Sequence, residues 1–317
     1  MNKASKPPSY IDTATGINPF EPKRSYIHPV MKVVRFCVAC IKIPSLISTF
    51  SISMMYYILA MIIPITKIRV MLIKITSYIF DRLILFLFGN VFIHVVPTPL
   101  IDTFNEPGEL KKVNPGDIII SNFGSYLNIF WLQSKYSPLY VVPNDTQTVV
   151  VYSFFTLIIG ILTKTPMKSG KKVKLEKVIQ IAKENQSPIV IFPERCPTNG
   201  SGLLTFCEFG EKVKLFDTNF HIICFSHQFS GESPNFTCGN GFLHVFRMLG
   251  RSMASMKVKI ALPQDIPPFE SQIDSEWLEK VRIVMGKILR VPLLSVNYES
   301  SFEFYETIES QRKSHID

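Results

Sequence analysis

The fold of this 317-residue chain is decided by a stretch that reads Ile189-Val190-Ile191-Phe192-Pro193-Glu194-Arg195-Cys196-Pro197-Thr198-Asn199-Gly200. Its first four residues form an unbroken apolar run, which is typical of a strand buried on both faces of a sheet. A carboxylate and a glycine-containing turn follow directly. Open α/β sheets bind ligands beyond the carboxyl ends of their strands. The stretch therefore predicts either a ligand site at that edge or an ordinary strand-to-loop turn.

Similar short apolar runs lie on both sides of this stretch, and segments with helical periodicity separate them. The runs are Ile118–Ile120, Leu139–Val142, His221–Phe225 and Val258–Leu262, and the clearest helical segments are Val173–Glu184 and Asp274–Leu289. Buried strands that alternate with helices predict an α/β domain. We expect a mixed, mostly parallel sheet with helices on both faces. The uncharged segment 146–163 falls between two predicted strands and is expected to be a buried or membrane-resting helix.

The apolar residues, 47% of the chain, gather near the amino terminus. Residues Ile43–Thr66 carry no charge over 24 positions, more than the roughly 20 that a helix needs to cross a bilayer. A shorter apolar run, Leu83–Val96, suits a half-inserted or core-packed helix. Basic residues flank the first run on both sides, so the positive-inside rule gives no orientation. The pattern predicts a membrane-embedded helical hairpin with both ends in the cytosol.

These patterns divide the chain into four parts. We predict a basic amino-terminal segment (1–42), a membrane-anchoring hairpin (43–96), an α/β domain (97–300) and a polar carboxyl-terminal tail (301–317). The net charge is +9, from 34 basic and 25 acidic residues. Without a nucleic-acid motif, this charge suits phosphate head groups or coenzyme A better than nucleic acid. The Cys37-x-x-Cys40 pair has no second pair beside it, so no metal site is predicted.

The stretch after Ile191 resembles the third motif of the PlsC-type glycerolipid acyltransferases, F-P-E-G-T-x-T-N-G-x-x-L-L-x-F. Nine positions match in register: Phe192, Pro193, Glu194, Thr198, Asn199, Gly200, Leu203, Leu204 and Phe206. Arg195 stands where the family has Gly. Residues 277–292 resemble the family's closing helix and its L-x-V-P segment, so the resemblance covers most of the chain from Pro97 on. Residues 15–22 are similar to the T-G-I-x-P-F-x-P segment of fungal lysophosphatidic acid:oleoyl-CoA acyltransferases.

This resemblance implies a PlsC-like acyltransferase domain in the cytosol, at the endoplasmic reticulum membrane or the lipid droplet. The implied reaction, in phospholipid and triacylglycerol synthesis, transfers an acyl group from acyl-CoA, with no bound cofactor, to lysophosphatidic acid or a related lysophospholipid. Its implied substrate-binding residues are Lys164, Arg195, Thr198, Asn199 and Gly200, with Glu194 also in the acceptor site. Arg195 and Lys164 would meet the phosphate, Lys164 being the cation nearest to the family's G-x-I-x-x-x-R motif.

The family's first motif, N-H-x-S-x-x-D, is altered in this chain. Asn122 and Ser125 match it, whereas Phe123 replaces the His that deprotonates the acceptor hydroxyl and Asn128 replaces the Asp that orients that His. Neither replacement can serve as a general base. The resemblance still implies that Asn122, Ser125 and Asn128 line the pocket of this motif.

His227 follows the predicted strand 221–225, so it would lie at the same sheet edge as Glu194 and is a candidate substitute base. A structural histidine is the commoner interpretation of such a position. Two functions therefore remain open. The first is an acyltransferase, since a thiolate leaving group and good positioning can support catalysis. The second is an inactive relative that binds lipid or acyl-CoA and organises membranes or lipid droplets.

Overall fold

The computed structural model describes residues 8–100, 109–163, 171–209, 218–269 and 273–313. In this part of the chain, eight strands form one sheet with the order β1-β8-β7-β2-β6-β3-β4-β5. Their bounds are β1 Phe92–Thr98, β2 Ile118–Ser121, β3 Leu139–Pro143, β4 Thr148–Tyr152, β5 Lys171–Lys174, β6 Ile189–Ile191, β7 Phe220–Gln228 and β8 Ser255–Ala261.

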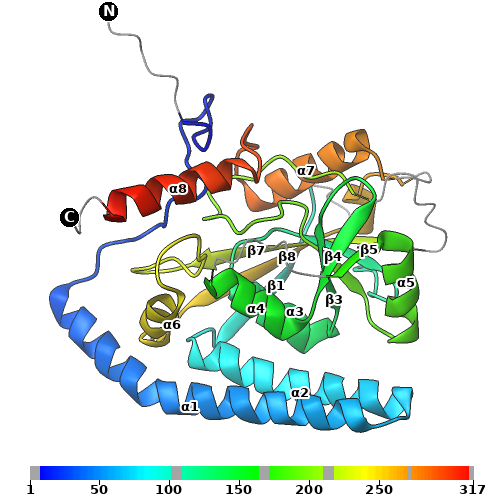
Figure 1. The fold of residues 1–317 in the computed structure, drawn as a ribbon, viewed down its shortest axis with the longest axis horizontal. Helices are drawn as coiled ribbons and strands as arrows, with labels where there is room; N and C mark the ends of the chain where they lie inside the picture. Colours follow the sequence, from blue (N-terminus) through cyan, green and yellow to red (C-terminus); the bar gives the residue numbers. More distant parts are fainter. Residues whose placement is uncertain (1–7, 101–108, 164–170, 210–217, 270–272, 314–317) are drawn as a thin grey trace, which may run out of the picture.

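Helices cover both faces of this sheet (Figure 1). Their bounds are α1 Pro29–Ile62, α2 Thr66–Leu87, α3 Tyr126–Tyr136, α4 Phe154–Thr163, α5 Leu175–Glu184, α6 Gly241–Leu249, α7 Ser275–Leu289 and α8 Ser300–Lys313. The predicted strands and the two predicted helices are all present within a few residues. Helix α7 is capped by Asp274, whose side chain accepts the Trp277 N–H (2.7 Å).

The strand pairing confirms a mixed, mostly parallel sheet. Strands β7, β2, β6 and β3 run parallel in the centre, and β1 runs parallel to β8. The pairs β7–β8, β3–β4 and β4–β5 are antiparallel. Because the central strands share one direction, the residues after β2, β6 and β7 meet at one edge. This edge carries the candidate site.

Alternate residues of each central strand enter different cores. Ile119 packs with residues of α3, α4 and α6 on one face, whereas Ile118 and Ile120 pack with residues of α5 and α7 on the other. This two-residue period is that of a pleated strand with both faces covered. The apolar runs that predicted the strands are therefore explained by burial on both sides.

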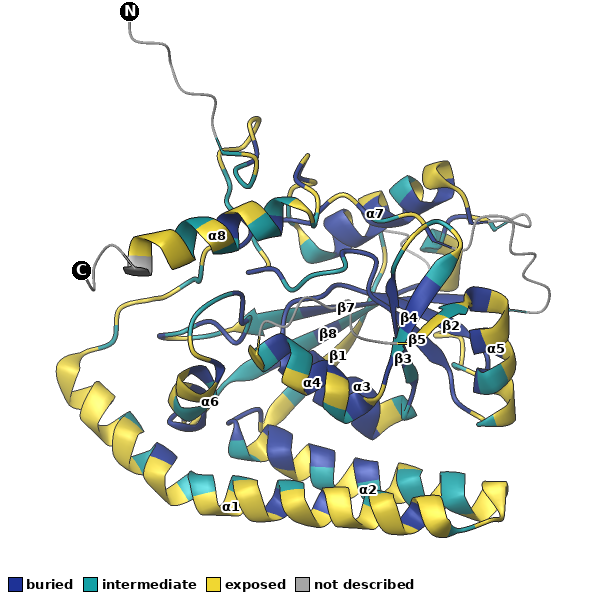
Figure 2. Ribbon diagram, in the orientation of Figure 1, coloured by how far each residue is buried: buried dark blue, intermediate teal, exposed yellow. Residues whose placement is uncertain are grey.

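The predicted hairpin is present with different boundaries. Helices α1 and α2 pack against each other, and α2 packs on α3, so the pair forms an outer layer on one side of the molecule (Figures 1 and 2). Helix α1 begins at Pro29 and carries Pro44 in its interior, although proline removes one helical hydrogen bond. Among the described residues, no helix has both the length and the apolar character needed to cross a membrane. The embedding of the hairpin in a membrane is thus unsupported.

Two apolar segments that were expected to be helices each divide into a helix and a strand. In the run Leu83–Val96, α2 ends at Leu87, and Gly89 takes a positive φ of 82° that stops the helix. The rest of the run forms β1, an edge strand paired with β8. Segment 146–163 similarly contains β4 and then α4. Uninterrupted apolar character does not by itself distinguish the two types of element.

The two ends of the described chain pack together over the loop after β6. Phe20 and Phe304 join Leu204 in a third apolar cluster, and Tyr10 meets Phe304 edge to face with ring centroids 5.3 Å apart. Phe304 belongs to α8, so the predicted polar tail contributes to the core. This cluster holds the amino-terminal segment beside the sheet edge.

Candidate functional site

A cavity of about 190 Å³ lies at the carboxyl edge of β2, β6 and β7. Polar residues that follow these strands line one part of it, and apolar residues line another. Its lining includes Lys23, Asn122, Glu194, Thr198, Asn199, Gly200, His227, Phe229 and Asn235. The edge predicted from the Ile189–Gly200 stretch therefore does carry a cavity.

Asn122 joins β2 to β7 just where the cavity begins. Its Oδ1 accepts the Phe225 N–H (2.8 Å), and its Nδ2 donates to the Phe225 carbonyl oxygen (3.1 Å). These two hydrogen bonds to the Phe225 backbone extend the pairing of the two strands by one residue. Asn122 therefore fixes the spacing between the end of β2 and the His227 region of β7.

Glu194 is fully buried and acts as the centre of the loop after β6. Its Oε2 accepts the Phe123 N–H (2.8 Å), and its Oε1 accepts the Leu204 N–H (3.3 Å). Burial raises the pKa of Glu194 to about 7, although both N–H groups and Arg282 oppose the rise. Glu194 thus holds two loops together and can exchange a proton near neutral pH.

Phe123, at the position of the motif His, belongs to the core. Its ring stacks on Phe192 with centroids 4.5 Å apart, and the side chain is 1% exposed. The Phe123 carbonyl oxygen accepts the Thr198 N–H (2.9 Å). The position therefore serves packing and backbone hydrogen bonding, and offers no proton acceptor to the cavity.

His227 contacts Asn128, the residue at the position of the motif Asp. Its Nε2 lies 2.7 Å from Asn128 Oδ1, so the ring donates from Nε2 and keeps its lone pair on Nδ1. Burial, and then the Arg251 guanidinium, lower the pKa of His227 to about 3. The imidazole is therefore neutral at physiological pH and can accept a proton, but its basicity is low.

Asn128 is held in place by the start of α3. Ser125 caps this helix, because its Oγ accepts the Leu127 N–H (3.1 Å) and donates to the Pro234 carbonyl oxygen (2.8 Å). Ser125 therefore acts as a helix cap and lies outside the cavity lining. Its role is to set the first turn of α3, from which Asn128 meets His227.

The predicted substrate-binding residues separate into two groups. Thr198, Asn199 and Gly200 line the cavity, and Gly200 has a positive φ of 71° that brings bare backbone to its wall. Arg195 does not line it: the guanidinium carbon lies 3.8 Å from the centroid of the Tyr298 ring. Arg195 has a φ of 61°, a conformation that suits the Gly of the family pattern. Lys164 lies outside the described residues.

Sequence reasoning missed two cavity residues, Asn235 and Lys23. Gly124 and Gly200 leave room for Asn235, since an added Cβ would lie 2.7 and 2.8 Å from its Nδ2. Its buried Oδ1 has no hydrogen-bond partner among the described residues. The sequence around Asn235 matches only the glycosylation acceptor pattern Asn-x-Thr. Lys23 comes from a distant segment, and nothing in its local sequence indicates the site.

The part of the chain that the structure describes contains no group of three or more His, Cys, Asp or Glu side chains able to hold a metal ion. In comparisons with known proteins, no family model, no curated protein and no solved structure matches this chain. The resemblance to the PlsC-type acyltransferases therefore rests on the motifs quoted above.

Proposed function

We propose that the protein is an acyl-CoA-dependent acyltransferase that acylates lysophosphatidic acid or a related lysophospholipid, with His227 as the proton acceptor. One observation carries this proposal. The His227 ring lies on the wall of the cavity that Glu194 also lines, and it is hydrogen-bonded to Asn128, the residue at the position of the motif Asp. A histidine from β7 would thus act as the proton acceptor, which Phe123 cannot do.

In the proposed step, the acceptor hydroxyl oxygen attacks the thioester carbonyl carbon of acyl-CoA. The hydroxyl proton passes to His227, and the C–S bond breaks to give the new ester and the coenzyme A thiolate. The thiolate then takes the proton, which restores neutral His227. A thiolate is a good leaving group at neutral pH, so a weak base can still assist the reaction.

The other cavity residues would position the two substrates. The Oδ1 atom of Asn235, which has no partner within the described residues, can accept a hydrogen bond from a hydroxyl group of the acceptor. Gly200 allows a substrate to approach the backbone closely. Positioning of this kind can lower a bimolecular barrier by about 7 to 11 kcal/mol, which is more than a general base supplies.

Two observations favour the second function, that of an inactive lipid- or acyl-CoA-binding relative. Asn128 is neutral, so it cannot stabilise an imidazolium as a carboxylate would. The pKa of His227, about 3, makes the ring a poor base. In this alternative the same cavity binds its ligand without turnover, and the protein organises membranes or lipid droplets.

Acylation by purified full-length protein distinguishes the two functions. We expect labelled oleoyl-CoA and lysophosphatidic acid to give phosphatidic acid, and His227→Ala and Glu194→Ala to reduce the rate. His94→Ala, which changes an exposed histidine on β1, is the matched control and should leave the rate unchanged. Wild-type turnover no faster than that of Glu194→Ala would reject the enzyme and favour the inactive relative.

We also propose that the α1–α2 hairpin rests on a lipid surface, which would place the protein at the endoplasmic reticulum membrane or the lipid droplet. Apolar side chains of its outer face are exposed, among them Ile58 (52%), Ile62 (73%) and Ile79 (54%) (Figure 2). The exposed Lys67, in the first turn of α2, can meet anionic head groups. An apolar helix face of this kind suits binding in the plane of a membrane.

Co-sedimentation with vesicles that contain phosphatidylserine tests this placement. Ile58→Asp with Ile62→Asp should move the protein from the vesicle pellet to the supernatant. Ile283→Asp, on α7 across the sheet from the hairpin, is the matched control and should leave binding unchanged. Equal pelleting of the hairpin variant and the wild type would contradict the proposed membrane face.

A further inference from the structure

Residues Ile17–Ser25, called here the amino-terminal strap, lie beside the cavity, and Lys23 of the strap lines the cavity itself. Asn199 attaches the first half of the strap: its N–H donates to the Pro19 carbonyl oxygen (2.7 Å), and its Nδ2 donates to the carbonyl oxygens of Asn18 and Glu21 (both 2.8 Å). The side chain of Asn199, a residue of the family motif, therefore binds the strap.

The second half of the strap pairs with residues 231–233. The Ser233 N–H donates to the Lys23 carbonyl oxygen (3.0 Å), and the Ser25 N–H donates to the Gly231 carbonyl oxygen (2.7 Å). Arg24 pairs with the Glu232 carboxylate at 3.6 Å. These contacts on both sides of Lys23 fix the position of its backbone.

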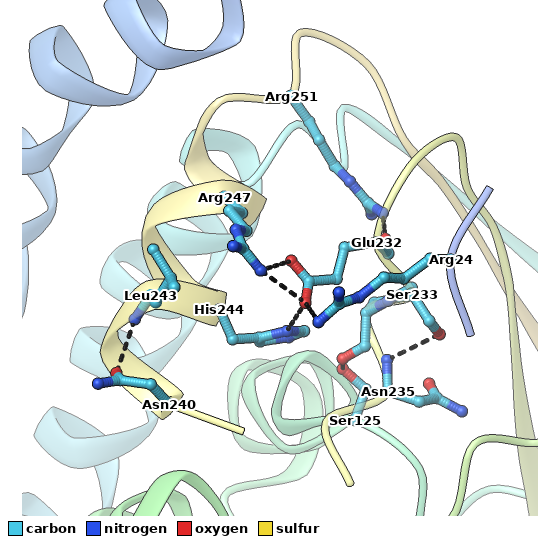
Figure 3. A network of polar contacts seen from close by, with 11 residues as sticks. Arg24, Ser125, Glu232, Ser233, Asn235, Asn240, Leu243, His244, Arg247 and Arg251 are labelled. Carbon is cyan, nitrogen blue, oxygen red and sulfur yellow. Dashed lines mark hydrogen bonds and ion pairs between the residues drawn. The ribbon is translucent and has the colours of Figure 1, made fainter. Parts of the chain in front are cut away.

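Glu232 extends this attachment to α6. Figure 3 shows its carboxylate between Arg24, Arg247 and His244. The N–O distances to these three side chains are 3.6, 3.3 and 3.8 Å. Arg251 donates to the Glu232 carbonyl oxygen. The strap is thus joined, through one half-buried carboxylate, to a helix of the folded domain.

The strap forms one wall of an open groove of about 510 Å³ that adjoins the cavity. Lys23, Asn199 and Phe229 line both spaces. A substrate can therefore extend from Glu194 and His227 in the cavity, past Lys23, into the groove.

Lys23 is an uncommitted cation at this junction. Among the described residues its ammonium group has neither a hydrogen bond nor an ion pair, whereas the neighbouring Arg24 is paired with Glu232. The side chain is half-buried, and burial lowers the pKa of Lys23. Two carboxylates share these walls: Glu194 already accepts two N–H groups, and Glu21 is exposed. An anionic ligand would thus meet a partly desolvated cation that has no partner in the described part of the chain.

We infer that Lys23 binds a phosphate group of the substrate, and that the strap is the element that presents it. This inference rests on the proposed acyl transfer for the identity of the ligand, but not for the site itself. The phosphate can come from the head group of the lysophospholipid or from coenzyme A. With the phosphate at Lys23, the rest of the ligand would extend toward His227 and Glu194.

Calorimetric titration of the full chain tests the inference without any need for turnover. The two probes are a short-chain lysophosphatidic acid below its micellar concentration and free coenzyme A. Loss of one hydrogen bond between charged groups weakens binding by about 10- to 100-fold. We expect Lys23→Ala to lower the affinity for one probe by this factor, and Lys23→Arg to retain it. The probe that is affected identifies the source of the phosphate.

Lys177→Ala, an exposed lysine on α5, is the control for a general loss of positive charge and should bind both probes as the wild type does. The inference is overturned if Lys23→Ala binds both probes with wild-type affinity, or if the wild type binds neither. Failure of acyl transfer with normal Lys23-dependent binding would reject the proposed reaction and leave the phosphate site standing.

Discussion

The substitution Asn128→Asp tests the proposed role of His227 most directly. It places a carboxylate where the acyltransferase motif has one, on the first turn of α3 and beside the His227 ring. Because Asn and Asp have nearly the same shape, the 2.7 Å contact between His227 Nε2 and the Oδ1 atom should persist. The change is therefore one of charge, applied to a single hydrogen bond.

The size of the effect follows from that distance. A contact of 2.7 Å puts the two charge centres about 4 Å apart, where opposite unit charges attract by about 4 kcal/mol at an effective dielectric constant of about 20. Desolvation of the new carboxylate opposes part of this gain, and a neighbouring opposite charge typically moves a pKa by about 1 to 3. The pKa of His227 should thus rise from about 3 to roughly 4 to 6.

A stronger base brings the proton transfer closer to the optimum at neutral pH. We expect kcat for acyl transfer to rise by about 10- to 100-fold, within the range that general acid–base catalysis supplies. The acid limb of the pH–rate profile should move up with the pKa of His227. Steady-state rates with oleoyl-CoA between pH 4 and 8 measure both effects.

The double variant Asn128→Asp with His227→Ala is the control, since the gain requires the ring. A gain that survives without His227 would refute the proposed proton transfer. So would an unchanged rate in an Asn128→Asp protein whose His227 resonances show the raised pKa. Thermal unfolding of both variants ensures that only folded proteins are compared.

Three further predictions concern stability. Between about pH 4.5 and 7 the folded protein keeps a proton on Glu194 that the unfolded chain releases. The wild-type free energy of unfolding should therefore fall by about 3 kcal/mol as pH rises through this window. Urea titrations of Glu194→Gln should lack that fall. Burial likewise raises the pKa of Asp81 in α2, so Asp81→Asn should raise Tm at pH 8 and have less effect near pH 4; a lower Tm at pH 8 would contradict this. Phe123→Ala removes the stack on Phe192 and should cost about 3 to 5 kcal/mol by urea denaturation, a loss below 1 kcal/mol being inconsistent with a core role.

The sequence predicts the sheet and its functional edge because the signals for both are local. Short apolar runs such as Ile118–Ile120 are bounded by turn residues, and parallel neighbours place their ends together. The same reasoning predicted His227 and Glu194 at one sheet edge, and both residues line the cavity there. The helix–strand division of Leu83–Val96 could not be predicted by the same means, since its apolar residues fit either element and Gly89 decides between them.

Contacts between distant segments account for the rest of what sequence reasoning missed. Lys23 reaches the cavity only because Asn199 and Glu232 hold the strap there, and no periodicity in residues 17–25 records those bonds. Arg195 was expected at the phosphate because of its charge. Its guanidinium group instead lies over the ring of Tyr298, a residue far away in the sequence, so the contact depends on tertiary packing. Local sequence patterns predict the helices and strands. The side-chain contacts between them depend on tertiary packing, which local patterns do not show.

The low basicity of His227 comes from the protein groups around its ring. Burial and the charge of Arg251 lower its pKa, and Asn128 adds no negative charge to oppose them. A phosphate group with a charge of about −1.5 to −2 at neutral pH would bring negative charge to Lys23, on the wall of the same cavity. Opposite charge favours the imidazolium, so a bound acceptor phosphate should raise the pKa of His227 and make the ring a better base when substrate is present. Histidine NMR spectra with and without short-chain lysophosphatidic acid would show this rise in the wild type and a smaller one in Lys23→Ala. An equal pKa in the free and bound wild type would mean that the base must act at its low intrinsic strength, which favours the inactive relative over the enzyme.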